Sequence, residues 1–432
     1  LCQLGTCFMK GIGVDINHKL AVHYFRLSAA QNYANGQYYY GVCLRDGIGE
    51  KIDHNFAAHY FKAAADQKHA KAEFCFGRCL MKGTGVPEKN EEEAVQYYQR
   101  SSMQNDDDGH WALGVCYMKG KVLSVDSNEA YKLFKKSADL GNPIGEYYLG
   151  VCFEKGEGVR RKLSEAVRYY QLSSDKGYKK AQCALGVCLL YGYGVTENQA
   201  DACKLLKLAV DQNYQRAMSY YGHCLEYGEG VGVDLEGAVD MYKKGAELGN
   251  PYSKTALALC MAKGKGGLEK DLQKAAQLFF EATEKDDPAA CFNYGCCLIR
   301  GDGIEKDSME ALKYFKRAFN FDKNGPLYWE SKIASQQPPS QQPPPPLASI
   351  SASNSTTNEM PNLIAPSQKV VNSKAKVKSR SKLASSRSAS SNSNSTKKTT
   401  IKTPSKSSSN ISIEYIYRRA ETVNIIDMSQ KY

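Results

Sequence analysis

Cysteine is the residue type in this sequence whose spacing most suggests chemistry. The chain has 432 residues and 15 cysteines, and nine of the cysteines recur at steps of 36 or 37 residues. Eight of the nine stand in a Gly-x-Cys segment, and the ninth follows Ala258 in place of glycine. The nine are Cys7, Cys43, Cys79, Cys116, Cys152, Cys188, Cys224, Cys260 and Cys297. Thiolates at regular intervals could form disulfides or bind a metal ion.

The spacing argues against both kinds of chemistry. If the cysteines lie on equivalent helices of neighbouring repeats, those helices are ~8–10 Å apart. That distance exceeds the roughly 7 Å between Cα atoms that a disulfide can span. The other cysteines form no Cys-x-x-Cys pair, and the 7 histidines follow no metal spacing such as His-Glu-x-x-His. We therefore expect free thiols that pack in the interior, a reducing compartment, and no metal ion or other cofactor.

Glycine pairs in the repeat predict turns and not nucleotide sites. Four residues after each repeated cysteine stands a glycine, which in eight of nine repeats begins a Gly-x-Gly segment, as at Gly11 and Gly192. These pairs lack the third glycine and the strand of a dinucleotide loop, and the sequence has no Gly-x-x-x-x-Gly-Lys-Ser/Thr segment for phosphates. No Ser, His and Asp constellation can be assigned either. We expect no catalytic residues and conclude that the chain is not an enzyme.

Each glycine turn is followed by the signals of a helix start. An N-cap residue stands at one fixed position in eight of nine repeats, as at Asp53, and Lys162 is the exception. Alanine follows four residues later in every repeat, and a Phe or Tyr ring stands four residues further on in eight of them, as at Phe61. Small residues beside a ring are typical of close helix packing. Each unit is therefore predicted to be a helix with the Gly-x-Cys segment, a Gly-x-Gly turn, and a second helix.

The segments Leu-Gly-x-Cys, Gly-x-Gly-Val, the N-cap and Ala-x-x-Tyr-Phe-x-x-Ala-Ala together resemble the Sel-one-like repeat (SLR), a relative of the tetratricopeptide repeat. The resemblance covers roughly residues 1–330 and is most complete at residues 21–30 and 149–159. It implies an all-α fold, a right-handed α/α superhelical solenoid of about nine 36-residue helical hairpins over residues 1–334. It also implies scaffolding of protein complexes.

The first helices of such stacked repeats form an extended concave face, where we expect a protein or peptide partner to bind. The position two residues before the Gly-x-Cys glycine varies between Tyr, Ala, Cys and Asn, and tyrosine is favoured at interfaces. The position before it is often aromatic, for which packing between repeats is the alternative. The candidate partner-binding residues are Tyr39, Tyr148, Tyr220, Asn293 and Trp111. Cations at the ends of the first helices are explained by the helix dipole, with an acidic partner as the alternative.

Charge divides the chain into two parts. Residues 331–432 hold fifteen Lys and Arg against four Asp and Glu, so they carry the whole net charge of +11 and residues 1–330 are neutral. A neutral solenoid argues against nucleic-acid binding by the repeats. Residues 335–432 are expected to form a disordered tail, rich in Pro and Gln and then in Ser and Lys. Its basic block is expected to contact anionic surfaces or to direct nuclear import. The block contains Lys374, Lys376, Lys378, Arg380 and Lys382.

These features predict a non-enzymatic scaffold or adaptor in the cytoplasm or the nucleus. A transmembrane segment is not expected, because the sequence has no run of about eighteen apolar residues. The family resemblance leaves two narrower roles open: an adaptor in endoplasmic-reticulum-associated degradation, or the regulatory C-terminal part of a protein kinase. Because Leu1 falls inside a predicted helix, we also expect further sequence upstream of it, where a kinase domain would lie.

Overall fold

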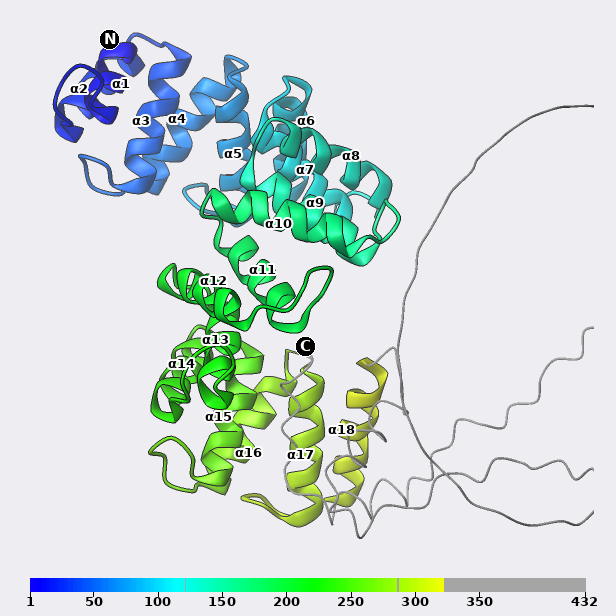
Figure 1. The fold of residues 1–432 in the computed structure, drawn as a ribbon. Helices are drawn as coiled ribbons and strands as arrows, with labels where there is room; N and C mark the ends of the chain where they lie inside the picture. Colours follow the sequence, from blue (N-terminus) through cyan, green and yellow to red (C-terminus); the bar gives the residue numbers. More distant parts are fainter. Residues whose placement is uncertain (121, 286, 322–432) are drawn as a thin grey trace, which may run out of the picture. The chain divides into compact units, whose positions relative to one another are not determined.

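The computed structural model describes residues 1–120, 122–285 and 287–321, and this part of the chain forms eighteen α-helices and no strand (Figure 1). The helices are α1 (Cys2–Lys10), α2 (His18–Ala30), α3 (Ala34–Asp46), α4 (His54–Asp66), α5 (Ala70–Lys82), α6 (Glu91–Met103), α7 (Asp107–Lys119), α8 (Ser127–Asp139), α9 (Pro143–Lys155), α10 (Leu163–Asp175), α11 (Lys179–Tyr191), α12 (Gln199–Asp211), α13 (Gln215–Tyr227), α14 (Leu235–Glu247), α15 (Pro251–Lys263), α16 (Leu272–Thr283), α17 (Pro288–Arg300) and α18 (Ser308–Phe321). Each odd-numbered helix carries the repeated cysteine, and the even-numbered helix after it carries the alanine and the ring. The predicted series of nine helical hairpins is confirmed.

A glycine ends the first helix of each hairpin, and a second glycine two residues later brings the turn close to the preceding repeat in most of them. In the seventh repeat, Gly228 has a φ of 74° and its N–H donates to the carbonyl of Cys224 at 2.9 Å. Gly230 has a φ of 72°, and a Cβ added to it would lie 2.2 Å from the carbonyl oxygen of Gln199, the first residue of α12. A side chain at Gly230 would therefore be strained in conformation and would collide with the neighbouring repeat.

Side-chain caps start the even-numbered helices where the sequence predicts them. The Oδ1 atom of Asp53 accepts the N–H of Phe56 at 3.0 Å at the start of α4. All eight predicted cap residues accept such a bond. Lys162, at the start of α10, makes no side-chain cap bond. Each cap satisfies a backbone N–H group that the helix itself leaves free.

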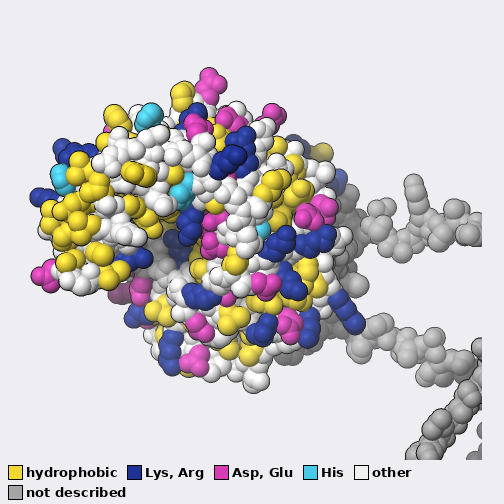
Figure 2. Space-filling view, turned by 90° about the horizontal axis from the view of Figure 1, so that it is seen from above, with side chains coloured by type: hydrophobic (Ala, Val, Ile, Leu, Met, Phe, Trp, Pro, Cys, Tyr) yellow, Lys and Arg dark blue, Asp and Glu magenta, His cyan; other side chains and the backbone are white. Residues whose placement is uncertain are grey.

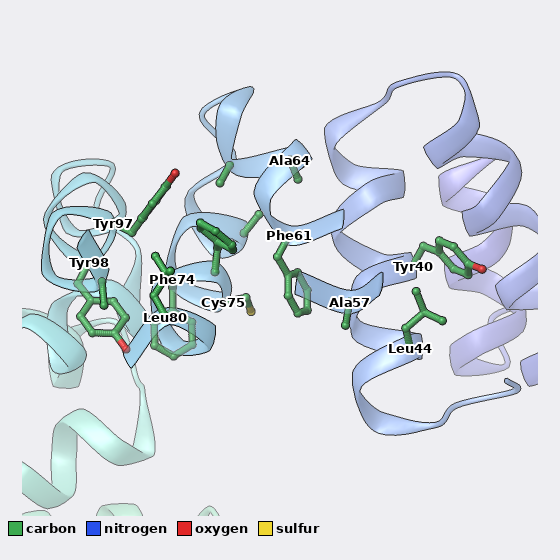
Figure 3. Packing of buried hydrophobic residues seen from close by; sticks show 14 of the residues in the cluster. Tyr40, Leu44, Ala57, Phe61, Ala64, Phe74, Cys75, Leu80, Tyr97 and Tyr98 are labelled. Carbon is green, nitrogen blue, oxygen red and sulfur yellow. The ribbon is translucent and has the colours of Figure 1, made fainter. Parts of the chain in front are cut away.

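The glycine of a Gly-x-Cys segment receives the ring of the following even-numbered helix in every case except Gly186, which faces Leu206. A Cβ added to Gly41 would lie 2.8 Å from Cε1 of Phe61, closer than real Cβ atoms approach. Phe61 is fully buried, and Figure 3 shows it among the buried residues of α3 to α6, including Phe74 and Tyr98. The missing side chain lets two helices pack closely while the ring fills the space between them.

Contacts between consecutive repeats are made by helices and by side-chain hydrogen bonds. The odd-numbered helices contact the next odd-numbered helix, as α5 does with α7, α7 with α9, α11 with α13 and α13 with α15. We call the surface that these helices form the odd-helix face. The Nε2 atom of Gln67, which follows α4, donates to Oε1 of Gln37 in its own repeat at 2.8 Å and to Oδ1 of Asn32 in the preceding repeat at 3.3 Å. Gln212 bonds Gln182 and the carbonyl of Gly177 in the same way.

None of the described helices is long and apolar enough to cross a membrane. The expected end of the solenoid at residue 334 and the predicted tail, with its basic block, lie outside the described residues.

Candidate partner-binding face

The cysteines, which first suggested chemistry, are all free thiols in this structure. Eleven of the fifteen are buried, among them Cys43 and Cys152, which are fully inaccessible. Burial raises the pKa of each of these two thiols to about 12. A thiol with so high a pKa is a poor nucleophile and metal ligand at neutral pH, and it packs as a small apolar side chain.

Among the described residues, one acidic group is close enough to hold a cation: Asp106, Asp107 and Asp108, at the start of α7. Asp106 caps the helix by accepting the N–H of Gly109 at 3.0 Å and also accepts the hydroxyl of Ser101. Asp107 and Asp108 both accept the Nδ2 amide of Asn142, at 2.9 and 3.0 Å. Capping and contact with the next repeat therefore account for all three carboxylates.

Three cavities open on the odd-helix face, and each is lined by residues predicted to bind a partner. The first, over α3, α5 and α7, is lined by Tyr39. The second, the Trp111 cavity, lies over α5, α7 and α9 and is lined by Trp111 and Tyr148. The third, the Tyr220 cavity, lies over α9, α11 and α13. The structure thus brings Trp111 and Tyr148 to one cavity and separates them from Tyr39 and Tyr220.

The predicted tyrosines also pack between repeats. The ring of Tyr39 stacks on Phe25 of the preceding repeat with centroids 5.1 Å apart, and Tyr148 stacks on Phe134 in the same way at 5.0 Å. Tyr39 and Tyr148 are half-buried, whereas Tyr220 is only 6% exposed at the wall of its cavity. One face of each stacked ring is consequently used for repeat packing, while the residue still lines its cavity.

Trp111 and Asn293 differ from the tyrosines in how their polar atoms are used. The Nε1 atom of Trp111 donates to Oδ1 of Asp108 at 2.9 Å, which fixes the indole at the cavity wall. Asn293 is fully buried, and its Nδ2 atom donates to the carbonyl of Ala289 at 2.9 Å within α17. Asn293 is therefore not on the surface in this conformation. Cys75 and Ala112, at the same position of other repeats, are each 4% exposed. Ala112 nevertheless lines the Trp111 cavity, and Ala184 at this position lines the Tyr220 cavity.

The Tyr220 cavity combines aromatic walls with charged residues from three repeats. Tyr147 of α9 and Tyr214, which precedes α13, line it together with Lys180 of α11 and Arg216 of α13. The guanidinium of Arg216 lies 5.8 Å from the ring centroid of Tyr220. The only carboxylate in the lining of the Tyr220 cavity is that of Glu154, which accepts a hydrogen bond from the hydroxyl of Tyr170.

Lys180 and Arg216 were not among the predicted site residues. Both stand six residues before the Gly-x-Cys glycine, in the first turn of an odd-numbered helix. Other repeats hold Asn35, Lys71 and Ile144 there, and all of these line a cavity too. This position holds chemically different residues from repeat to repeat, whereas the next position always holds Gly, Ala or Ser. That contrast is the signal that could have identified the position as part of the surface.

Comparisons with known proteins agree with the repeat that the structure displays. The family model described as "Sel1 repeat" matches nine times, at residues 1–33, 34–69, 74–106, 107–142, 143–178, 179–214, 215–250, 251–287 and 288–320. A protective antigen of uropathogenic Escherichia coli, c5321, which displays an SLR fold, is 25% identical, with 74% of this chain and 75% of that chain covered and a TM-score of 0.45. A Sel1 repeat protein from Oxalobacter formigenes is 23% identical, with coverage of 67% and 84% and a TM-score of 0.45. Cysteine-rich protein B of Helicobacter pylori is 22% identical over 30% of this chain and 92% of its own, with a TM-score of 0.25. Since the matched repeats span nearly the whole described part, the chain belongs to the Sel1 repeat family.

Proposed function

We propose that the solenoid is a non-enzymatic scaffold that binds a partner protein along the odd-helix face. Sel1-repeat proteins are generally protein-interaction scaffolds, and membership of this family supports a scaffold function. The observation that carries the proposal is the row of three cavities on one face, because four of the five residues predicted to bind a partner line them. Aromatic side chains at the wall of a cavity are typical anchor points for a partner.

The proposal includes a cytoplasmic or nuclear location. Fifteen free thiols within one chain suit a reducing compartment better than an oxidising one. The two narrower roles, an adaptor in endoplasmic-reticulum-associated degradation and the regulatory part of a protein kinase, stay predictions.

Site-specific photo-crosslinking in cells tests where a partner binds. A photoreactive amino acid is placed at Tyr148 or Tyr193, which line cavities of the odd-helix face, and in matched variants at Lys207 or Lys243, exposed on α12 and α14. We expect both odd-face positions to crosslink to the same protein, identified by mass spectrometry, and the even-helix positions to give no such product. A partner captured only from Lys207 or Lys243 would contradict the proposal. Circular dichroism confirms that each variant keeps its helices.

A further inference from the structure

The Trp111 cavity and the Tyr220 cavity carry an excess of positive charge that the rest of the solenoid does not share. Residues 1–330 contain equal numbers of basic and acidic side chains, and Figure 2 shows the two kinds interspersed over the surface in view. The linings of the two cavities contain seven cations and only two carboxylates. Six of the cations form no ion pair with any described carboxylate: Arg78, Lys82, Lys119, Arg161, Lys180 and Arg216.

Both carboxylates of the two linings are already engaged. Glu91 pairs with the seventh cation, Lys89, at 2.5 Å, and Glu154 accepts the hydroxyl of Tyr170. The backbone carbonyl of Glu154 also accepts the Nε atom of Arg161 at 2.9 Å. The cations are therefore not balanced by acidic groups within the cavities, and negative charge is the missing complement.

Lys180 is the residue for which the fold offers the least explanation. It lines both cavities, so it marks the place where they adjoin. It stands in the first turn of α11, a helix with no side-chain cap and no acidic residue in that turn, where the helix dipole disfavours a cation. Burial, together with the nearby Lys119 and Lys179, lowers the pKa of its ammonium group. Arg216 occupies the same position in the next repeat, at the start of α13, which also lacks a side-chain cap.

We propose that the two adjoining cavities bind an acidic peptide segment of the partner, with its carboxylates at Lys180 and Arg216 and its apolar side chains against Trp111 and Tyr147. This inference rests on the proposed scaffold function and names the chemistry of the partner. The cavities have volumes of about 230 and 530 Å³ and meet at Lys180, so the space is elongated and fits an extended chain. Charge-assisted hydrogen bonds to a carboxylate would be strong in such a partly desolvated site.

Two other occupants fit the charges less well. The residues of this chain beyond the described part carry a net charge of +11 from residue 331 onward, so the cavities repel them. A nucleic acid is bound by a domain with a broad basic surface, whereas residues 1–330 contain equal numbers of basic and acidic side chains.

Fluorescence polarisation with the full chain tests the proposal. The probe is a labelled peptide of Glu interspersed with Phe, and its counterpart carries Gln in place of Glu. The variant Lys180→Glu/Arg216→Glu is compared with Lys207→Glu/Lys243→Glu, which makes the same charge change on α12 and α14. We expect the Glu probe to bind, the cavity variant to raise its Kd at least ten-fold, and the control variant to leave the Kd unchanged. The two new glutamates lie in the first turns of α11 and α13, where the helix dipole favours them, so the cavity variant should unfold no more readily than the wild type.

Several outcomes would overturn the proposal. Equal binding of the Glu and Gln probes, or equal affinity of the two double variants, would show that the cations do not recognise carboxylates. Binding of a phosphoserine probe without binding of the Glu probe would assign the site to phosphopeptides, and displacement of the Glu probe by a single-stranded oligonucleotide would assign it to nucleic acid. If the crosslinking experiment locates the partner on the odd-helix face while the Glu probe fails to bind, the acidic-peptide proposal is wrong and the scaffold proposal stands.

Discussion

Replacing Gly222 with alanine measures how tightly the two helices of one repeat fit together. The new Cβ would lie 2.6 Å from Cε1 of Tyr242 and 2.9 Å from its Cδ1. The ring cannot swing away freely, because it is 1% exposed and its hydroxyl donates to Oε2 of Glu226 at 3.0 Å. Overpacking of this kind costs about 2–3 kcal/mol, while alanine gains about 1 kcal/mol over glycine inside a helix. We therefore expect the variant to lose about 1–2 kcal/mol of stability.

Urea unfolding followed by circular dichroism, with amide hydrogen exchange in α13 and α14, is the assay. Two further variants separate the effect of the added methyl group from the effect of the hydrogen bond that holds the Tyr242 ring. Ala258→Gly makes the reverse change in the eighth repeat, where the native slot already holds a buried alanine, so it too should destabilise the protein, by about 1 kcal/mol or more. Tyr242→Phe removes the tether to Glu226, and in that background Gly222→Ala should cost about 0.5–1 kcal/mol less.

The reasoning would be refuted by a Gly222→Ala variant as stable as the wild type, or more stable. That result would mean that the ring yields without cost and that helix propensity alone decides the sign. An unchanged penalty in the Tyr242→Phe background would show that burial, and not the hydroxyl, holds the ring.

Three further predictions concern capping, charge and thiols. Lys162→Asn should raise the free energy of unfolding by about 1 kcal/mol in urea titrations, because Lys162 is the one N-cap residue of the described even-numbered helices that makes no side-chain cap bond. The exposed ion pair between Lys162 and Glu165, which the substitution removes, contributes little to stability. Burial raises the pKa of Asp287 to about 6, above its value in the unfolded chain, so the folded state takes up a proton as the pH falls from about 6 to about 4. Over that range the free energy of unfolding should increase by about 2–3 kcal/mol more in the wild type than in Asp287→Asn, and parallel pH series that coincide would contradict this. In reaction with Ellman's reagent, the native protein should show fast modification of at most its four partly exposed cysteines, and the denatured protein should show all fifteen; fast modification of more than four in the native state would contradict the assigned burial.

The sequence predicts the fold in detail because its signals are local and repeated. Gly41 of the Gly-x-Cys segment leaves the space that the ring of Phe61 fills, so each of the two residue types makes the other predictable. The cap at Asp53 and the left-handed glycine at Gly228 each act within a few residues. Nine copies of the same signals remove the ambiguity that a single copy would have.

The candidate site could be predicted only in part, because cavities form between repeats. Trp111 and Tyr148 were predicted from their residue types, and both line a cavity. Lys180 lines two cavities, yet it looks like an ordinary exposed lysine when its own repeat is considered alone. Asn293 was predicted from the chemical variety at its position, but it is fully buried and its amide donates to the carbonyl of Ala289 within α17. Depth of burial depends on the neighbouring units, which the sequence of a single repeat does not reveal.

The paired glycine turns make the units that carry them interchangeable at their borders. A Cβ added to Gly85 would collide with the carbonyl oxygen of His54 in the preceding unit, and one added to Gly230 would collide with that of Gln199. If a whole unit with the glycine pair were copied or excised in the gene, the same backbone contact would form at the new border, since each such unit presents one half of it on either side. A shift by part of a unit would place a side chain where the carbonyl needs glycine. The array is thus free to lengthen or shorten over evolutionary time in whole-unit steps, while the cations at the start of α11 and α13 can change without disturbing those borders.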